Sequence, residues 1–161
     1  SKHDPVGRKI IYDFLPESLK KLMPIGRLDM NSEGMLLLTN NGELKRFLEL
    51  PANNIARTYV VRVIGKIYPE KLVKIESGIK IDGIFYKAKE ISIMSDENIN
   101  KWLEITLCEG KNREIRNICK FFDLGISRLI RISYGHLELG TLAKGKILEV
   151  NEKLINKFRY K

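Results

Sequence analysis

The spacing of apolar and polar residues predicts more strands than helices in this chain. Residues 57–66 (RTYVVRVIGK) alternate polar with apolar side chains and are rich in β-branched residues, which is typical of a half-buried strand. The Asp82–Gly83 pair is a hairpin signal. The predicted strands are residues 35–39, 57–66, 101–110, 127–135 and 147–150, with two more inside 79–94 on either side of Asp82–Gly83.

Helical spacing is clearest in residues 112–125, where apolar side chains recur at Ile115, Ile118, Cys119 and Phe122 and Gly125 suits the helix end. The other predicted helices are residues 8–22, interrupted near Pro16 and ended by Pro24, then 43–50, 69–78 and 151–158. Residues 25–34 read as a strand end that runs into a loop. This order predicts an α+β fold with a mixed, largely antiparallel sheet and flanking helices, in one domain over residues 1–161.

Charge is the most informative feature of the composition. Lys and Arg number 29 against 20 Asp and Glu, a formal net charge of +9. Such a balance indicates a nucleic-acid partner, although a solvated basic surface explains it too. No apolar stretch is long enough for a membrane span, and the polar N-terminus does not resemble a signal peptide, so we expect a cytoplasmic protein.

The cysteines and histidines do not suggest a metal or cofactor site. Cys108 and Cys119 lack zinc-like or CxxC spacing, and we expect two free thiols. His3 and His136 are too few and too far apart for a metal centre. We expect His136 and Trp102 to be structural.

Three segments carry residues suited to chemistry, each with a structural alternative. In residues 25–44, Asp29 stands where a strand meets a loop, with Arg27 two positions away, but Asp is also common in turns. In residues 57–63, Tyr59 could face a base, but a strand tyrosine is more often a core aromatic. In residues 109–118, Arg113 and Arg116 are helical neighbours that would need a phosphate or carboxylate nearby, unless they form a solvated basic helix start.

These segments together resemble one enzyme family. GRLDMNSEGMLLLTNNGEL (26–44), RTYVVRVIG (57–65) and EGKNREIRNICKFFDLGISRLIRISYG (109–135) resemble the three motifs of a family of bacterial ribosomal RNA pseudouridine synthases. This family includes synthase A, which modifies small-ribosomal-subunit RNA, and synthase B, which modifies large-ribosomal-subunit RNA. The resemblance extends from about Asp4 to Val150, and its SEG and SYG details favour the synthase B branch. Met35 and Asn41 stand where Leu and Asp are commoner in the family.

The resemblance implies the catalytic fold of this family and the isomerisation of a specific uridine in ribosomal RNA, with a stem-loop of 23S rRNA favoured. It implies no cofactor and no metal. The family usually carries an N-terminal S4-type RNA-binding domain, and this chain begins after that region. We expect a monomer because no heptad or extended apolar patch is visible.

The resemblance also assigns residues. It makes Asp29 the catalytic carboxylate, Arg116 its partner and Tyr59 the aromatic residue that stacks on the base, with a hydroxyl suited to accept the late proton from carbon. Arg27 would fill the gap left by the flipped uridine. The further candidates for RNA contact are Arg57, Arg62, Lys111, Asn112, Arg113, Lys120, Arg128 and Arg131.

Other functions remain compatible with the residues. The same chemistry could act on 16S rRNA of the small ribosomal subunit. A non-catalytic rRNA-binding assembly factor would carry the same positive charge. A hydrolysing glycosidase would need a second carboxylate, for which Glu33 is the available residue. A metal-dependent nuclease would need acidic clusters that the sequence lacks.

Overall fold

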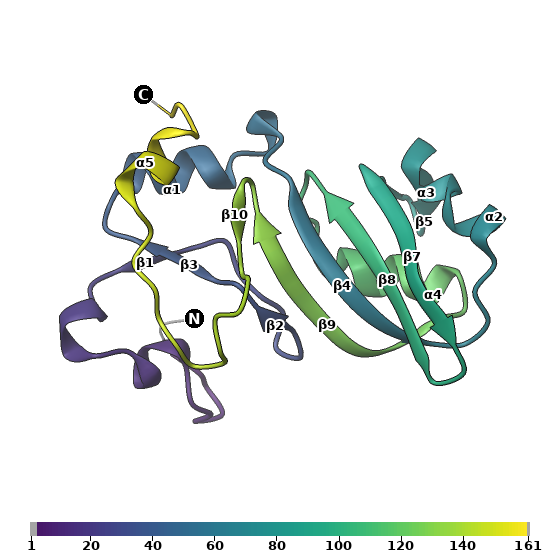
Figure 1. Ribbon diagram of the computed structural model, residues 1–161, viewed down its shortest axis with the longest axis horizontal. Coiled ribbons are helices and arrows are strands. Elements are labelled where there is room, and N and C mark those ends of the chain that lie inside the picture. Colours follow the sequence, from purple (N-terminus) through teal and green to yellow (C-terminus); the bar gives the residue numbers. More distant parts are fainter. Residues whose placement is uncertain (1–2, 161) are drawn as a thin grey trace.

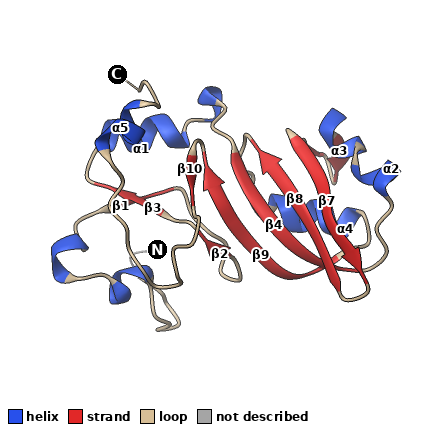
Figure 2. Ribbon diagram, viewed as in Figure 1, coloured by secondary structure: helices blue, strands red, loops and turns tan. Residues whose placement is uncertain are grey.

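The computed structural model describes residues 3–160, in which one six-stranded sheet dominates (Figures 1 and 2). Its antiparallel strands follow the spatial order β10-β9-β4-β8-β7, and β2 pairs with β9 in parallel. The bounds of these strands are β2 (Glu33–Gly34), β4 (Arg57–Ile64), β7 (Glu90–Glu97), β8 (Asn100–Leu107), β9 (Gly125–Tyr134) and β10 (Leu137–Glu138).

Smaller elements flank this sheet. Two antiparallel ribbons pair β1 (Met23–Ile25) with β3 (Leu37–Thr39) and β5 (Ile79–Ile81) with β6 (Ile84–Tyr86). The helices are α1 (Gly42–Glu49), α2 (Pro69–Leu72), α3 (Lys74–Ser77), α4 (Glu114–Phe121) and α5 (Glu152–Asn156), with 3₁₀ turns at Ile11–Phe14, Glu17–Leu19 and Pro51–Asn53. The expected α+β fold with a largely antiparallel sheet is confirmed.

One face of the sheet packs on α4 and forms the first of two apolar cores. Along β8, Leu103, Ile105 and Leu107 are buried while the residues between them are only partly buried. The buried side chains meet Ile115 and Ile118 of α4 in one cluster. In Figure 1 α4 lies behind the sheet, and the opposite face looks toward the viewer.

The second apolar core lies at the other end of the molecule, among α1, β1, β3, β10 and α5 (Figure 1). It contains Ile25, Met35, Leu48 and the fully buried Tyr134 at the end of β9. Because Leu129 of the same strand belongs to the first core, β9 connects the two clusters.

Several predicted elements agree with the structure, and their local causes are visible. The helices expected at 43–50 and 112–125 correspond to α1 and α4, and the strands expected at 57–66, 101–110 and 127–135 correspond to β4, β8 and β9. Asn41, unusual for the family, caps α1 by accepting hydrogen bonds from the amides of Glu43 and Leu44. Cys108 and Cys119 are free thiols as expected, and burial raises the pKa of Cys119 to about 12.

Other predictions were wrong. Residues 8–22 form two separate 3₁₀ turns, because Leu15 is extended before Pro16, as residues preceding a proline usually are. Residues 147–150 are not a strand, since no strand of the described chain pairs with them and Leu148 is exposed. The short β10 was not predicted.

Two further predictions were correct only in part. The helix expected at 69–78 is divided at Val73 into α2 and α3. The expected hairpin at Asp82–Gly83 is present as β5–β6, but β7 is a separate strand that joins the main sheet. Within residues 3–160, no helix is both long and apolar enough to cross a membrane.

Gly34 lets β2 lie directly against β9. Its φ is +104°, and a Cβ placed there would be 2.2 Å from the carbonyl oxygen of Arg131. A side chain at this position would therefore combine an unfavourable backbone conformation with a clash against a backbone atom that cannot move independently. The parallel β2–β9 pairing depends on this glycine.

We predict that Gly34→Ala lowers the free energy of unfolding by at least about 2 kcal/mol, because the strain and the clash add. The matched control is Gly42→Ala, in α1, where a Cβ would meet nothing within 4 Å. That substitution should be neutral or slightly stabilising. Urea unfolding of both variants checks this, and equal midpoints would contradict the role given to Gly34.

A pair of carboxyl groups, the buried Glu114 and the partly exposed Glu109, lies at the start of α4. Glu114 is 3% exposed, and its Oε2 accepts a hydrogen bond from the amide of Lys111 at 3.1 Å. The Oε1 atom of Glu109 and the Oε1 atom of Glu114 are both buried. If both carboxyl groups were ionised, neither atom would accept a hydrogen bond. Burial first, and then the neighbouring Glu109, raise the pKa of Glu114 to about 8. A proton held by Glu114 and donated to Glu109 satisfies both groups.

We predict that this protonated pair makes stability fall as the pH rises. Glu114 has a folded pKa near 8 against an ordinary value of 4.5, so the folded protein holds a proton that the unfolded chain loses between these values. Urea unfolding at about pH 5.5 and about pH 8 should show a smaller decline for Glu114→Gln than for wild type. Glu90→Gln, at an exposed position of β7, should decline like wild type.

Candidate active site

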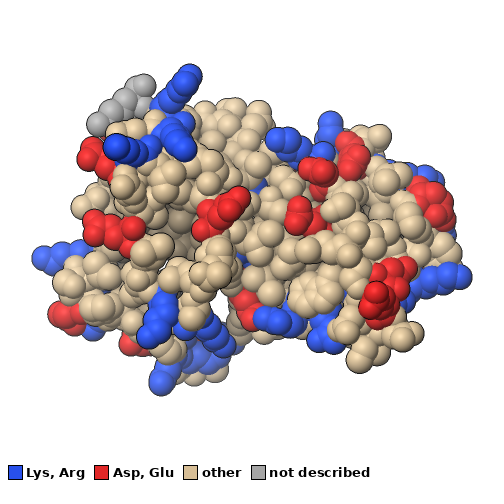
Figure 3. Space-filling view, viewed as in Figure 1, with Lys and Arg blue, Asp and Glu red and all other residues tan. Residues whose placement is uncertain are grey.

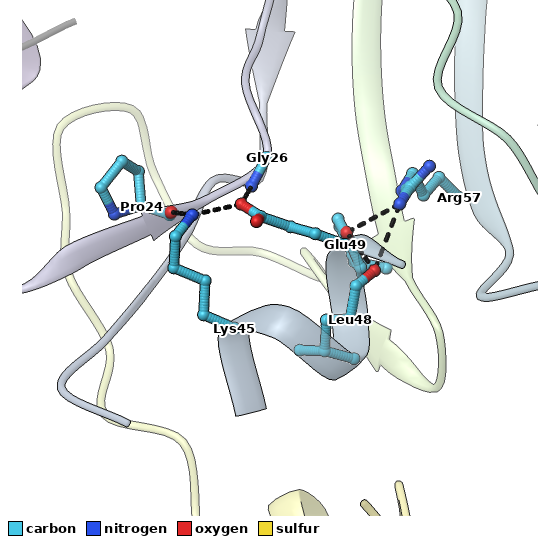
Figure 4. A network of polar contacts seen from close by, with 7 residues as sticks. Pro24, Gly26, Lys45, Leu48, Glu49 and Arg57 are labelled. Carbon is cyan, nitrogen blue, oxygen red and sulfur yellow. Dashed lines mark hydrogen bonds and ion pairs between the residues drawn. The ribbon is translucent and has the colours of Figure 1, made fainter. Parts of the chain in front are cut away.

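The loop of residues 26–32 joins β1 to β2 and carries Arg27 and Asp29. Helix α1 fixes its beginning: the amide of Gly26 donates to Oε1 of Glu49 at 2.8 Å, and Nζ of Lys45 donates to the carbonyl of Pro24 at 2.8 Å (Figure 4). Lys45 and Glu49 also form an ion pair. The chain therefore enters the loop from a fixed point.

Strand β9 contacts the chain on both sides of Asp29. Nε of Arg131 donates to the carbonyl of Met35 at 2.8 Å, and Nη1 donates to the carbonyl of Arg27 at 3.3 Å. The amide of Met35 donates to the carbonyl of Arg131 at 2.9 Å, beside the β2–β9 pairing. Inside the loop, the amide of Ser32 donates to the carbonyl of Asp29 at 2.9 Å.

The structure brings Asp29 and Arg116 together across the two halves of the molecule. Nε of Arg116, on α4, lies 3.8 Å from Oδ2 of Asp29, and Nη2 of Arg116 donates to the carbonyl of Asn31 at 3.1 Å. The side chains are 35% exposed for Asp29 and 16% for Arg116. Asp29 is thus held beside a cation and remains accessible to a substrate. It is not deeply buried, although it has a charged partner. Nε of Arg116 is buried and has no hydrogen bond with any described residue.

Tyr59 lies in β4 on the face that packs against α4. It is partly buried beside the first apolar core, and its cross-strand neighbours are Ile105 and Arg131. Because Arg131 holds the Asp29 loop, Tyr59 stands next to the residue that anchors this loop.

The turn before α4 places three of the expected RNA-binding residues on the element that carries Arg116. Arg113 is exposed, with a left-handed backbone at φ +52°. Nζ of Lys111 pairs with Glu109 at 2.5 Å, while Asn112 is exposed and its carbonyl accepts from Asn117. Lys120 is exposed further along the helix.

Arg62 and Arg128 lie on the opposite face of the sheet, away from this group. They are cross-strand neighbours, and Arg62 alternates with Tyr59 along β4. Arg128 pairs with Glu33 at 2.9 Å and lies over the ring of Trp102. The hydrogen bond from Arg128 holds the pKa of Glu33 below its usual value, so Glu33 is occupied by this ion pair.

The expectation that Arg131 contacts phosphate is wrong, because Arg131 is 2% exposed and two of its nitrogens bond to backbone carbonyls. Arg57 is also engaged internally: Nη2 donates to the carbonyl of Leu48 (Figure 4). It also donates to the hydroxyl of Tyr134 at 3.0 Å. Its guanidinium lies over the Tyr134 ring. Arg57 therefore ties β4 to α1 and β9 rather than standing free for RNA.

Sequence reasoning did not identify the residues that anchor the loop. Lys45 and Glu49 are four positions apart on α1, a spacing that predicts a helical ion pair. That spacing carries no information about their contacts with Pro24 and Gly26. His136, expected to be structural, packs on the ring of Phe158 and bonds to the carbonyl of Leu154.

The surface charge is uneven on the face opposite α4. Figure 3 shows acidic and basic side chains interspersed over the sheet, with Lys and Arg concentrated at the lower left, over the N-terminal segment and the loop after β10. Among residues 3–160, no three His, Cys, Asp or Glu side chains are grouped so that they could hold a metal ion.

Comparison with known proteins gives consistent matches. The family model described as RNA pseudouridylate synthase matches residues 1–121. An uncharacterized RNA pseudouridine synthase of Rickettsia felis is 44% identical over 155 residues, which are 96% of this chain and 66% of that protein. Ribosomal large subunit pseudouridine synthase B of Yersinia pestis is 36% identical over 161 residues, 99% of this chain and 51% of that protein. The chain thus spans between half and two thirds of these relatives.

Two solved structures show a similar fold. A crystal structure of a pseudouridylate synthase aligns with a TM-score of 0.81 at 23% identity, covering 92% of this chain and 64% of the other. A chain of an H/ACA RNP bound to a substrate RNA aligns with a TM-score of 0.57 at 18% identity, covering 75% and 41%. With the family model and the curated relatives, these matches show that the chain belongs to the family of RNA pseudouridylate synthases.

Proposed function

We propose that this chain isomerises a uridine of ribosomal RNA to pseudouridine, with Asp29 as the catalytic carboxylate and residues 1–161 as the catalytic domain. The observation that carries the proposal is an accessible carboxylate held within 3.8 Å of the Arg116 guanidinium, on a loop fixed at both ends, in a member of this family. A group that must act on ribose needs both this accessibility and a fixed position.

The reaction rearranges bonds inside one nucleotide. The bond between C1′ of ribose and N1 of uracil breaks, the base turns, and C1′ joins C5 of the same base. The hydrogen on C5 leaves as a proton and N1 gains one, so the overall composition is unchanged. Asp29 would act at the ribose as a carboxylate, and this requires its ionised form.

Arg116 and Tyr59 supply the remaining functions. Arg116 places its guanidinium 3.8 Å from the carboxylate of Asp29 and bonds to the carbonyl of Asn31, so it would hold this carboxylate in position at the ribose. Tyr59 lies on the face of the sheet that packs against α4. Its ring would stack on the detached base, and its hydroxyl would accept the proton from C5.

The basic residues near this site would bind the RNA backbone and hold the RNA around the flipped uridine. Arg27 is exposed on the Asp29 loop, and we assign it to the gap left by the flipped uridine. Lys111, Asn112, Arg113 and Lys120 lie on α4 or its leading turn and would contact phosphates. Arg62 and Arg128 would contribute only if the RNA reached the opposite face of the sheet.

We propose large-subunit rRNA as the substrate. This choice is supported by the similarity to proteins named ribosomal large subunit pseudouridine synthase B in Yersinia pestis and Haemophilus influenzae, the latter at 37% identity. A stem-loop of 23S rRNA is the expected target.

The test is to incubate unmodified transcripts of the large-subunit and small-subunit rRNAs with this chain and map pseudouridines by carbodiimide block and primer extension. A new site in the large-subunit transcript is expected. A site only in the small-subunit transcript would change the substrate and keep the chemistry. Tight binding without any site would favour a non-catalytic assembly factor.

We predict that Asp29→Asn lowers turnover by at least about a thousandfold, because an amide cannot replace an essential carboxylate. RNA affinity and the melting temperature should change little, since Asp29 is 35% exposed and its ion pair is long. The matched control is Asp82→Asn in the β5–β6 turn, which makes the same chemical change at an exposed position. Turnover by Asp29→Asn comparable to the control would contradict the assignment.

We predict that Arg116→Met lowers turnover by about ten- to a hundredfold, because it removes the cation beside Asp29 and the bond to Asn31. The cost in stability should be small, about 1 kcal/mol, because the ion pair is partly exposed. Single-turnover rates and urea unfolding measure the two effects. Lys74→Met, at an exposed position of α3, is the control. A rate equal to that of the control would remove Arg116 from the site.

A further inference from the structure

Arg131 is an arginine in the interior without an acidic partner. Its exposure is 2%, and no Asp or Glu among residues 3–160 lies within ion-pair distance of it. A charged group is costly to remove from water, and an apolar residue of similar size usually packs there at least as well. The contacts of this side chain must therefore supply something that an apolar residue cannot.

Those contacts are made to the loop that carries Asp29. Nε bonds to the carbonyl of Met35 at 2.8 Å, after Asp29, and Nη1 bonds to the carbonyl of Arg27 at 3.3 Å, before it. The backbone carbonyl of Arg131 accepts from the amide of Met35. One residue thus holds both sides of the loop.

The environment of Arg131 keeps this group in one orientation. Its guanidinium lies 5.3 Å from the ring centre of Tyr134, which gives a buried cation a favourable surface. The hydroxyl of Tyr134 is itself bonded to the carbonyl of Leu48 at 3.0 Å. The planar guanidinium then presents its donors in fixed directions, which a lysine with one nitrogen cannot do.

The loop has few other contacts that would fix Asp29. Arg27 and Asn31 are exposed, and Met30 is 73% exposed. Because the loop buries little apolar surface of its own, its position depends mainly on bonds at its ends. Near its tip, Arg116 contacts Asp29 and the carbonyl of Asn31. The amide of Ser32 bonds to the carbonyl of Asp29, and Nη1 of Arg8 donates to Sδ of the exposed Met30.

We propose that Arg131 is a positioning residue for catalysis: it holds the backbone on both sides of Asp29 and thereby sets where the carboxylate stands relative to the ribose. The inference rests on the proposed function of Asp29. It also makes a structural claim, the immobilisation of residues 26–35, that is measurable without any activity.

The experiment compares Arg131→Met, Arg131→Lys, Asp29→Asn and Leu129→Ala in the full chain. Leu129 is buried in the same strand and belongs to the first apolar core, so Leu129→Ala destabilises β9 without removing a bond to the loop. Hydrogen–deuterium exchange of the peptide covering residues 26–35 measures loop order. Turnover of large-subunit rRNA transcript, measured well below each melting temperature, gives kcat and KM for folded protein.

Arg131→Met should speed exchange of residues 26–35 and lower kcat by about a hundredfold, with KM within about threefold of wild type, because the carboxylate is displaced while RNA contacts remain. Arg131→Lys should lie between Arg131→Met and wild type. Leu129→Ala should melt earlier but keep both loop exchange and kcat near wild type.

Unchanged exchange of residues 26–35 in Arg131→Met would overturn the inference, whatever the activity. So would a kcat like wild type in Arg131→Met when Asp29→Asn is inactive, or an equal loss of kcat in Leu129→Ala. If exchange rises in Arg131→Met but Asp29→Asn remains active, the proposed function fails and the anchoring of the loop by Arg131 stands.

Discussion

The attachment of the Asp29 loop to β9 is the constraint on which the site depends. Gly34 allows the chain to lie against the backbone of Arg131, and the amide of Met35 then bonds to the Arg131 carbonyl. This pairing ends the loop at a fixed point, as Glu49 of α1 fixes its start at Gly26. A carboxylate on an otherwise exposed loop gains a defined position from these bonds, without being buried and losing access to a substrate.

The ion pair between Asp29 and Arg116 connects parts of the protein that have separate cores. Asp29 lies on a loop flanked in sequence by Ile25 and Met35, which belong to the second apolar cluster, whereas α4 packs in the first. Because β9 contributes Leu129 to the first cluster and Tyr134 to the second, the geometry of the site depends on how this strand holds the clusters relative to one another. A substitution remote from Asp29 can therefore affect the site if it shifts either core.

The basic residues of the chain serve two different purposes. Arg57 and Arg131 bond to backbone carbonyls and pack against Tyr134, so their charge is used inside the protein. Lys111, Arg113 and Lys120 stand on or before α4, near the element that carries Arg116, and Arg62 and Arg128 occupy the other face of the sheet. The net charge of +9 therefore overstates the number of basic side chains that are available to bind RNA near Asp29.

Local patterns in the sequence were enough to predict the strands with clear alternation, such as β4 and β8, and the helices with strong local signals, such as α1 with its Asn41 cap. Motifs in the sequence also indicated Asp29 and Arg116. The resemblance also implied that these two residues pair, and the folded arrangement gives the 3.8 Å distance between them. The folded arrangement was needed to show that Arg131 is buried and that residues 147–150 find no strand partner among the described residues. Periodicity and caps are local properties of neighbouring residues, whereas burial and pairing depend on segments that approach one another only after the chain has folded.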